Sequence, residues 1–175
     1  MQGPAITLQL VRDDQASLLA EGLRAITAVE EAPPGSVIVV CSDGNPDYAV
    51  FGATFATLAR ARALGGFVVD GGMRGLADLK RVDVPVFARS VVPGSAGGHY
   101  RLKAVNDTVS CGGVRIAPGD VVVGDEDGIS IIPKGAAAEV FAKAQALREE
   151  KDAMLILIDR HRSYARAAAE YKRQP

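Results

Sequence analysis

Arg74 follows an aspartate and two glycines, and these residue types at this spacing are suited to binding an anion. Residues 67–79 read FVVDGGMRGLADL, so a short apolar run leads into Asp70, two glycines and then the arginine. Strands that open into glycine turns beside a helix N-terminus are places where α/β proteins bind anions. The sequence therefore predicts an anion pocket around Arg74, with residues 67–69 as a buried strand and a glycine turn directly after it.

A second stretch, residues 48–66, predicts a helix whose N-terminus borders the same pocket. It reads YAVFGATFATLARARALGG, with Gly52 where the helix begins and Gly65 and Gly66 where it ends. The first N–H groups of a helix have no partner inside the helix and point outwards. A glycine at that position also lets a ligand or another backbone approach closely.

The other patterns along the chain predict an α/β fold. Residues 36–40, SVIVV, are a continuous apolar run, which is typical of a strand covered on both faces. A helix over residues 15–30 is expected to be capped by Asp13 or Asp14. The further elements expected are strands at 5–11, 84–92, 101–105, 108–111, 114–116, 120–124 and 128–132, a short helix at 76–80, a flexible glycine-rich loop at 93–99, and one long helix or two over 135–172.

Length and composition favour a single globular domain, residues 1–175, in a reducing cytoplasmic setting. Twenty basic residues against 21 acidic ones give a net charge of -1, which argues against nucleic acid as a direct ligand. The two cysteines show no CxxC spacing, and we find neither a signal peptide nor an apolar run of ~18 residues that would indicate a membrane span. The two histidines form no zinc pattern, so a bound metal would be a hard, oxygen-liganded one.

Three further features of the sequence are most simply interpreted as structural rather than functional. The run DEDG at 125–128 lacks the alternating ligands of a calcium loop, so a hairpin turn is expected. Cys111 has no histidine placed to activate it and is expected to be a buried structural thiol. His99 is expected to be a solvated loop residue, although its loop could bring it to a site as an acid or a base.

Two long motifs carry a resemblance to a known family. The runs GATFATLARARALGGFVVDGGMRG and CGGVRIAPGDVVVGDEDGISIIPK, followed by LREEKD, resemble the RraA-like family over roughly residues 3–152. That family includes class II pyruvate aldolases acting on 4-hydroxy-4-methyl-2-oxoglutarate and 4-carboxy-4-hydroxy-2-oxoadipate, and the regulator of ribonuclease E activity. The resemblance implies a swivelling β/β/α fold with a long C-terminal helix, commonly assembled as a homotrimer or hexamer with sites between subunits. It also implies an N-terminal helical segment, which this chain is expected to lack.

The resemblance implies a role for each residue of the pocket. The backbone of Gly52, Ala53, Thr54 and Phe55 would donate hydrogen bonds to a 2-oxo acid such as pyruvate, and Arg74 would bind its oxygens through a planar fork. Mg²⁺ or Mn²⁺ would act as a Lewis acid that stabilises the pyruvate enolate.

The sequence departs from the family pattern at the expected metal anchor. Where family aldolases have an aspartate directly after the arginine, this chain has Gly75, and Ala53 stands where an acidic residue is common. Asp78, Asp70 and, from a neighbouring subunit, Asp152 or the nearby Glu149 and Glu150 are the possible substitute ligands. Alternatively, Arg74 pairs with Asp70 or Asp78 and only holds the turn, and the acidic residues near 150 form a solvated helix face.

Two functions remain open at this point. The first is a metal-dependent lyase that cleaves a 4-hydroxy-2-oxo diacid to pyruvate. The second is a non-catalytic trimer that acts by binding a protein partner, as the regulator of ribonuclease E does.

Overall fold

The computed structural model describes residues 1–172, which form two compact units. The first unit, Met1–Lys134, holds the strands and three helices, and the second begins at Gly135 and is helical.

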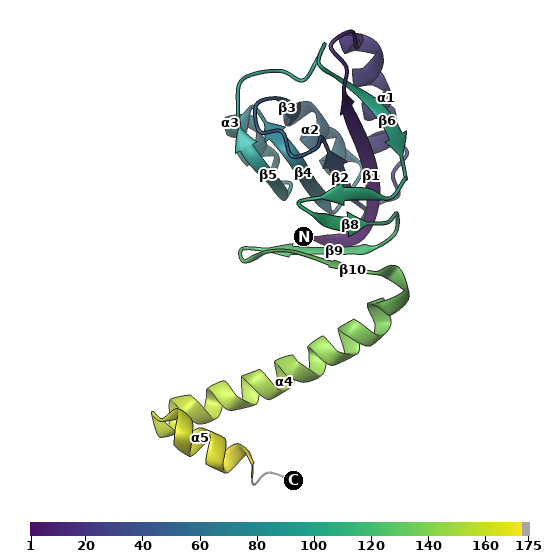
Figure 1. The fold of residues 1–175 in the computed structure, drawn as a ribbon. Helices are drawn as coiled ribbons and strands as arrows, with labels where there is room; N and C mark the ends of the chain where they lie inside the picture. Colours follow the sequence, from purple (N-terminus) through teal and green to yellow (C-terminus); the bar gives the residue numbers. More distant parts are fainter. Residues whose placement is uncertain (173–175) are drawn as a thin grey trace. The chain divides into compact units, whose positions relative to one another are not determined.

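A mixed sheet of eight strands is the framework of the first unit (Figure 1). The parallel pairs are β1–β2, β2–β4, β3–β4 and β4–β5, whereas β6 and β9 pair antiparallel with β1, and β10 with β9. A separate hairpin is formed by β7 and β8. The strands are β1 (Gln2–Arg12), β2 (Val37–Cys41), β3 (Ala49–Phe51), β4 (Gly66–Met73), β5 (Val86–Val91), β6 (Tyr100–Val105), β7 (Val109–Cys111), β8 (Val114–Ile116), β9 (Val121–Asp125) and β10 (Gly128–Ile132).

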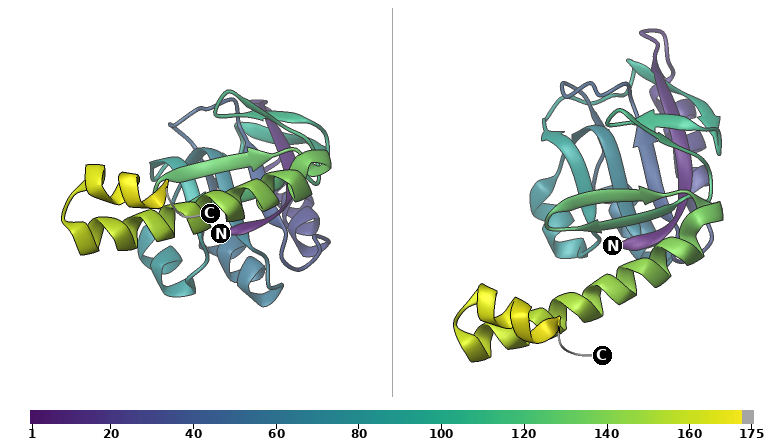
Figure 2. Two further views of the ribbon diagram at one scale, coloured as in Figure 1. Left: turned by 90° about the horizontal axis from the view of Figure 1, so that it is seen from below. Right: turned by 60° about the horizontal axis from the view of Figure 1, so that its bottom comes forward.

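Strands β2 and β4 are buried on both faces, as the apolar run at 36–40 predicts. Ile38 and Val40 of β2 belong to one apolar cluster, while Val37 and Val39 belong to another. The first cluster packs under helices α1 (Leu18–Glu30), α2 (Ala53–Ala61) and α3 (Leu76–Val82), and the second under β7, β8 and β9. Because successive side chains of a strand point to opposite faces, one run of valine and isoleucine builds both cores. Figure 2 shows α1, α2 and α3 on one side of the sheet.

Most expected strands and helices are present, with one strand missed and two local predictions wrong. The missed strand is β3, a three-residue segment that precedes helix α2. The cap of α1 is Ser17, whose hydroxyl accepts a hydrogen bond from Ala20 N at 3.3 Å, and neither Asp13 nor Asp14 fills that role. Asp13 instead accepts from Gln15 N in the turn before the helix, at 3.0 Å.

The second wrong prediction is the turn at Asp70-Gly71-Gly72, because β4 runs on through these residues to Met73. Gly71 and Gly72 allow neighbouring groups to pack closely against β4. A Cβ on Gly71 would stand 2.2 Å from Ser42 Oγ, and one on Gly72 would stand 2.6 Å from Val92 Cγ1. The glycine that turns the chain is Gly75, with a left-handed φ of 76°.

The second unit is a helical hairpin, so the C-terminal segment forms two helices. Helix α4 (Ala137–His161) follows a short 3₁₀ turn (Lys134–Ala136) and is joined to α5 (Tyr164–Tyr171). Glu170 accepts from Arg160 Nη1 at 2.9 Å and lies 2.5 Å from His161 Nε2, which ties the two helices together. Within residues 1–172, no helix is both long and apolar enough to cross a membrane.

Candidate functional site

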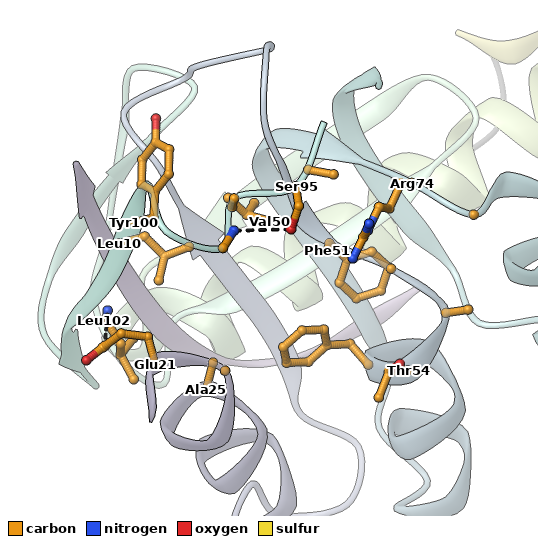
Figure 3. A pocket seen from close by; sticks show the side chains of 18 residues that line it. Leu10, Glu21, Ala25, Val50, Phe51, Thr54, Arg74, Ser95, Tyr100 and Leu102 are labelled. Carbon is orange, nitrogen blue, oxygen red and sulfur yellow. Dashed lines mark hydrogen bonds between the residues drawn. The ribbon is translucent and has the colours of Figure 1, made fainter. Parts of the chain in front are cut away.

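A cavity of about 400 Å³ lies in the first unit where β3 leads into α2 and β4 leads into α3 (Figure 3). Its lining brings together the residues expected to bind the anion, namely Gly52, Ala53, Thr54, Phe55 and Arg74, and also Gly75 at the expected metal-anchor position. They come from two segments about 20 residues apart. The parallel pairing of β3 with β4 places the ends of these two segments side by side.

The N-terminus of α2 offers two free backbone donors to this cavity. Gly52 is the N-cap residue and has no side chain to satisfy the first N–H groups of the helix. Phe55 N donates to Gly52 O at 3.1 Å, so that donor is already used. In the described part of the chain, Ala53 N and Thr54 N have no such partner, and they are the donors that a bound anion would meet.

Arg74 stands against this helix end, and no carboxylate of residues 1–172 forms an ion pair with it. A Cβ on Gly52 would lie 3.6 Å from Arg74 Cγ, and Arg74 N donates to Phe51 O at 3.0 Å. An exposed guanidinium beside two free N–H groups is an arrangement that favours a carboxylate or a similar anion.

The two aspartates weighed as partners of Arg74 are paired with other arginines. Asp70 bonds to Arg89 Nε and accepts from Gly112 N at 3.0 Å, and it lines a second cavity. Asp78 lies 3.2 Å from Arg81 Nη1 and has an exposed side chain. The interpretation in which Arg74 only holds its turn through Asp70 or Asp78 is therefore wrong.

Asp152, the third possible metal ligand, belongs to the second unit. It lies on α4, where its carboxylate is 3.9 Å from Arg148 one helical turn away. Glu149 likewise accepts from Gln145 Nε2 at 3.1 Å. Both contacts are those of a solvated helix face.

The residues of the cavity do not form a ligand set for Mg²⁺ or Mn²⁺. Gly75 carries no side chain at the family's anchor position, and in residues 1–172 no three histidine, cysteine, aspartate or glutamate side chains are grouped to hold a metal. Glu21 is the single carboxylate in the lining, and its oxygens are bonded to protein donors. Hard divalent cations need at least one or two carboxylates that are free to coordinate.

The opposite side of the cavity is formed by residues that sequence reasoning missed. Glu21 comes from α1, and Tyr100 and Leu102 come from β6. Glu21 Oε2 accepts from Leu102 N at 2.7 Å, which joins α1 to β6 across 81 residues of sequence. No local motif marks this pair, because it arises only when β6 folds back antiparallel to β1.

The loop at 93–99 is held against the sheet and closes the cavity between its two sides. Ala49 N donates to Gly94 O at 2.7 Å, and Ala96 N donates to Ala49 O at 3.1 Å. Ser95 Oγ accepts from Gly97 N at 3.2 Å, as Figure 3 shows. The predicted glycine-rich loop thus contributes Ser95, Ala96 and Gly97 to the wall of the cavity.

His99 lies at the end of this loop but outside the cavity lining. Its Nδ1 is 3.0 Å from Asp14 Oδ1, and Arg12 Nε donates to the same oxygen at 2.8 Å. The hydrogen bonds to His99 and then to Arg12 lower the pKa of Asp14. This exposed cluster fixes the ends of β1 and β6 rather than serving the pocket.

The two cysteines meet on the other face of the sheet. Cys41 and Cys111 are buried and free, and they lie in the same apolar cluster. The hydrogen bond with Cys111, followed by burial, raises the pKa of the Cys41 thiol, and the same bond lowers the pKa of Cys111. The pKa of Cys111 is thus lowered and that of Cys41 raised by the same contact.

Comparisons with known proteins agree with the resemblance in the motifs. The family model RraA-like (Aldolase/RraA) matches residues 1–131. A protein of Halalkalibacterium halodurans with the provisional name 4-hydroxy-4-methyl-2-oxoglutarate aldolase is 36% identical over 151 residues, which cover 86% of this chain and 68% of that protein.

Solved structures show the same fold. An uncharacterized protein from Pseudomonas syringae pv. tomato superposes with a TM-score of 0.87 at 29% identity, over 98% of this chain and 76% of that one. RraAS2 of Streptomyces coelicolor, described as an unusual member of the RNase ES inhibitor RraA family, superposes with a TM-score of 0.76 at 28% identity, over 87% and 74% of the two chains. The predicted α/β fold with a long C-terminal helix is confirmed.

Proposed function

Because the chain belongs to the RraA-like family, we propose that its cavity binds a pyruvate-like 2-oxo acid and that the protein is a lyase releasing pyruvate from a 4-hydroxy-2-oxo acid. The substrates to test are a 4-hydroxy-2-oxo monoacid and the diacid 4-hydroxy-4-methyl-2-oxoglutarate, which appears in the name of the Halalkalibacterium halodurans relative.

The observation that carries the proposal is Arg74, which has no ion-pair partner among residues 1–172, beside the free N–H groups of Ala53 and Thr54. Cleavage of the bond between C3 and C4 of such an acid leaves an enolate, whose negative charge must be stabilised. The guanidinium fork can bind the carboxylate of the 2-oxo acid, and the two N–H groups can donate to the oxygen on which charge develops. No step of this proposal uses a metal, because the residues of the cavity do not fit one.

The test is the release of pyruvate, followed by its enzymatic reduction, in protein with and without a chelator. Because no step uses a metal, turnover should persist in the chelator. Arg74→Ala should lower kcat/KM by about 100-fold or more, since it removes a charge-assisted interaction with the reacting acid. Arg81→Ala is the matched control, because Arg81 is an exposed arginine of the adjacent helix that lies 3.2 Å from Asp78. Absence of turnover of both acids, in wild type and in Gly75→Asp and with or without an added divalent metal, would rule out the lyase.

A second function, a non-catalytic regulator that binds a protein partner, is favoured by Gly75. Glycine at position 75 leaves the family's expected metal-anchor position without a carboxylate. RraAS2 is described as a member of a family of ribonuclease inhibitors. If this function holds, the protein should inhibit an RNase E-type nuclease in a purified assay. Wild type and Arg74→Ala should then inhibit equally, because the pocket would not take part.

We further propose that the protein assembles as a homotrimer or hexamer. Leu147, Leu155 and Ile156 of α4 have exposed side chains, and apolar side chains of this size on one helix favour burial against another subunit. Light scattering coupled to size-exclusion chromatography measures the mass, and a monomer would contradict the proposal.

A further inference from the structure

The charges of the cavity are few and lie on different elements. Among the described residues that line it, Arg74 is the one cation and Glu21 the one carboxylate. Arg74 follows β4 and borders α2, whereas Glu21 comes from α1 beside β6. In the sheet, β2 separates β4 from β1 and its neighbour β6, so the two charged groups belong to opposite sides of the cavity. Figure 3 shows them in this arrangement.

Glu21 is fixed in place as a hydrogen-bond acceptor. Its Oε2 accepts from Leu102 N at 2.7 Å, and Arg24 Nη1 donates to Oε1 at 3.3 Å and to Oε2 at 3.1 Å. The side chain of Glu21 is 20% exposed, whereas that of Arg24 is 53% exposed and does not line the cavity. Because solvent screens an exposed charge more than a partly buried one, Arg24 offsets the field of Glu21 inside the cavity only in part.

Apolar side chains separate the two charged groups. Phe51 and Phe55 stack with their ring centroids 5.9 Å apart on the Arg74 side. Leu10, Ala25 and Leu102 line the side of Glu21. A ligand whose carboxylate is held by Arg74 would thus extend over apolar surface towards a carboxylate. A second carboxylate on that ligand would meet no cation among the described residues that line the cavity.

We propose that the site selects monocarboxylate 2-oxo acids with an aliphatic or hydroxylated tail and rejects diacids, with Glu21 as the residue that excludes the second carboxylate. This inference rests on the proposed lyase function and names its substrate class. In the reaction, the bond between C3 and C4 breaks and its electron pair stays on C3 as the pyruvate enolate. The C4 hydroxyl loses its proton and becomes the carbonyl of a neutral aldehyde or ketone, and one proton returns to C3. The balance requires no oxidant, reductant or co-reactant.

Binding of two stable acids of equal length tests the selection apart from catalysis. The probes are 2-oxopentanoate, a monoacid, and 2-oxoglutarate, the diacid with the same number of carbons, each titrated by calorimetry with pyruvate as a reference. Wild type should bind 2-oxopentanoate roughly tenfold more tightly than 2-oxoglutarate, the size expected for one like-charge contact across a partly buried cavity.

Glu21→Gln should reduce that preference to within about threefold, because the amide oxygen still accepts from Leu102 N while the charge is lost. Glu30→Gln removes the same charge from an exposed position at the end of the same helix, outside the cavity, and should leave the preference unchanged. Thermal melting of both variants checks that each is folded.

The possible results distinguish failure of this inference from failure of the proposed lyase function. Equal or tighter binding of 2-oxoglutarate by wild type overturns the selection by Glu21 but leaves the 2-oxo acid site standing. A preference for the monoacid that persists unchanged in Glu21→Gln likewise overturns the role of Glu21. Failure to bind pyruvate and both probes overturns the proposed function itself, and the inference with it.

Discussion

Gly75 and Ala53 face each other at the N-terminus of α2: a Cβ on Gly75 would stand 3.9 Å from Ala53 Cβ and 4.0 Å from Ala53 N. These are ordinary contact distances, so the position has room for a side chain. They also mean that a carboxylate at residue 75 would reach the helix end beside Arg74, where the family's metal anchor is expected.

Gly75→Asp should therefore restore binding of Mn²⁺ at a modest cost in stability. The φ of Gly75 is 76°, and an L residue in the left-handed region loses about 1 kcal/mol or slightly more. Gly75→Ala is the matched control, since it has the same backbone cost without the carboxylate. Urea unfolding should show similar losses in both variants, and titration with Mn²⁺ should show binding only in Gly75→Asp. Binding by both, or by neither, would contradict the placement of the anchor.

Asp70→Asn should destabilise the first unit by about 1–3 kcal/mol, because Asp70 is buried and its two oxygens bond to Arg89 and Gly112 N. The measurement is the free energy of unfolding in urea. Asp78→Asn serves as the control, because Asp78 forms an exposed ion pair with Arg81 and such pairs contribute little. Equal losses of unfolding free energy in Asp70→Asn and Asp78→Asn would show that the buried contacts of Asp70 contribute no more to stability than an exposed ion pair.

The contacts of Asp14 should make stability fall in acid. His99 and Arg12 lower the pKa of Asp14 below its ordinary value of 3.8. A carboxyl whose pKa is lower in the folded state stabilises the protein above the unfolded value and loses that contribution as the pH falls through the folded value. The stability difference between wild type and Asp14→Asn should thus shrink from about pH 5 towards about pH 2. A difference that stays constant over this range would contradict the expected linkage.

Alkylation should modify Cys111 before Cys41. The hydrogen bond from the Cys41 thiol lowers the pKa of Cys111, and Cys111 also lines the second cavity, through which a reagent can approach. Mass spectrometry of protein treated briefly with iodoacetamide measures the order. Cys41→Ala removes the donor and should slow the reaction of Cys111 at a given pH, whereas faster modification of Cys41 in wild type would contradict the assignment.

Local patterns were enough to predict the half of the pocket that contains Arg74. The valine-rich strands, the helix after Gly52 and the arginine beyond β4 each follow from spacing within about 20 residues. A parallel sheet then brings such strand ends together at one edge. For the same reason the α/β class and the family motifs could be recognised without coordinates.

Tertiary structure alone decided where the remaining polar groups point. Asp70 faces the second cavity because β4 continues through Gly71 and Gly72, and side chains alternate along a strand, so that Asp70 lies on the face of Val68 and away from Phe67 and Val69. A turn at these glycines would have freed it to approach Arg74.

Glu21 and Leu102 are the clearest case of a contact that the sequence by itself could not show. They are 81 residues apart, and neither belongs to a motif. Their hydrogen bond exists because β6 pairs with β1 while α1 packs on the same face of the sheet. The sequence by itself thus determined the end of the cavity that contains Arg74, where local spacing places every group. The fold decided the opposite end, because only long-range strand pairing brings Glu21 to it.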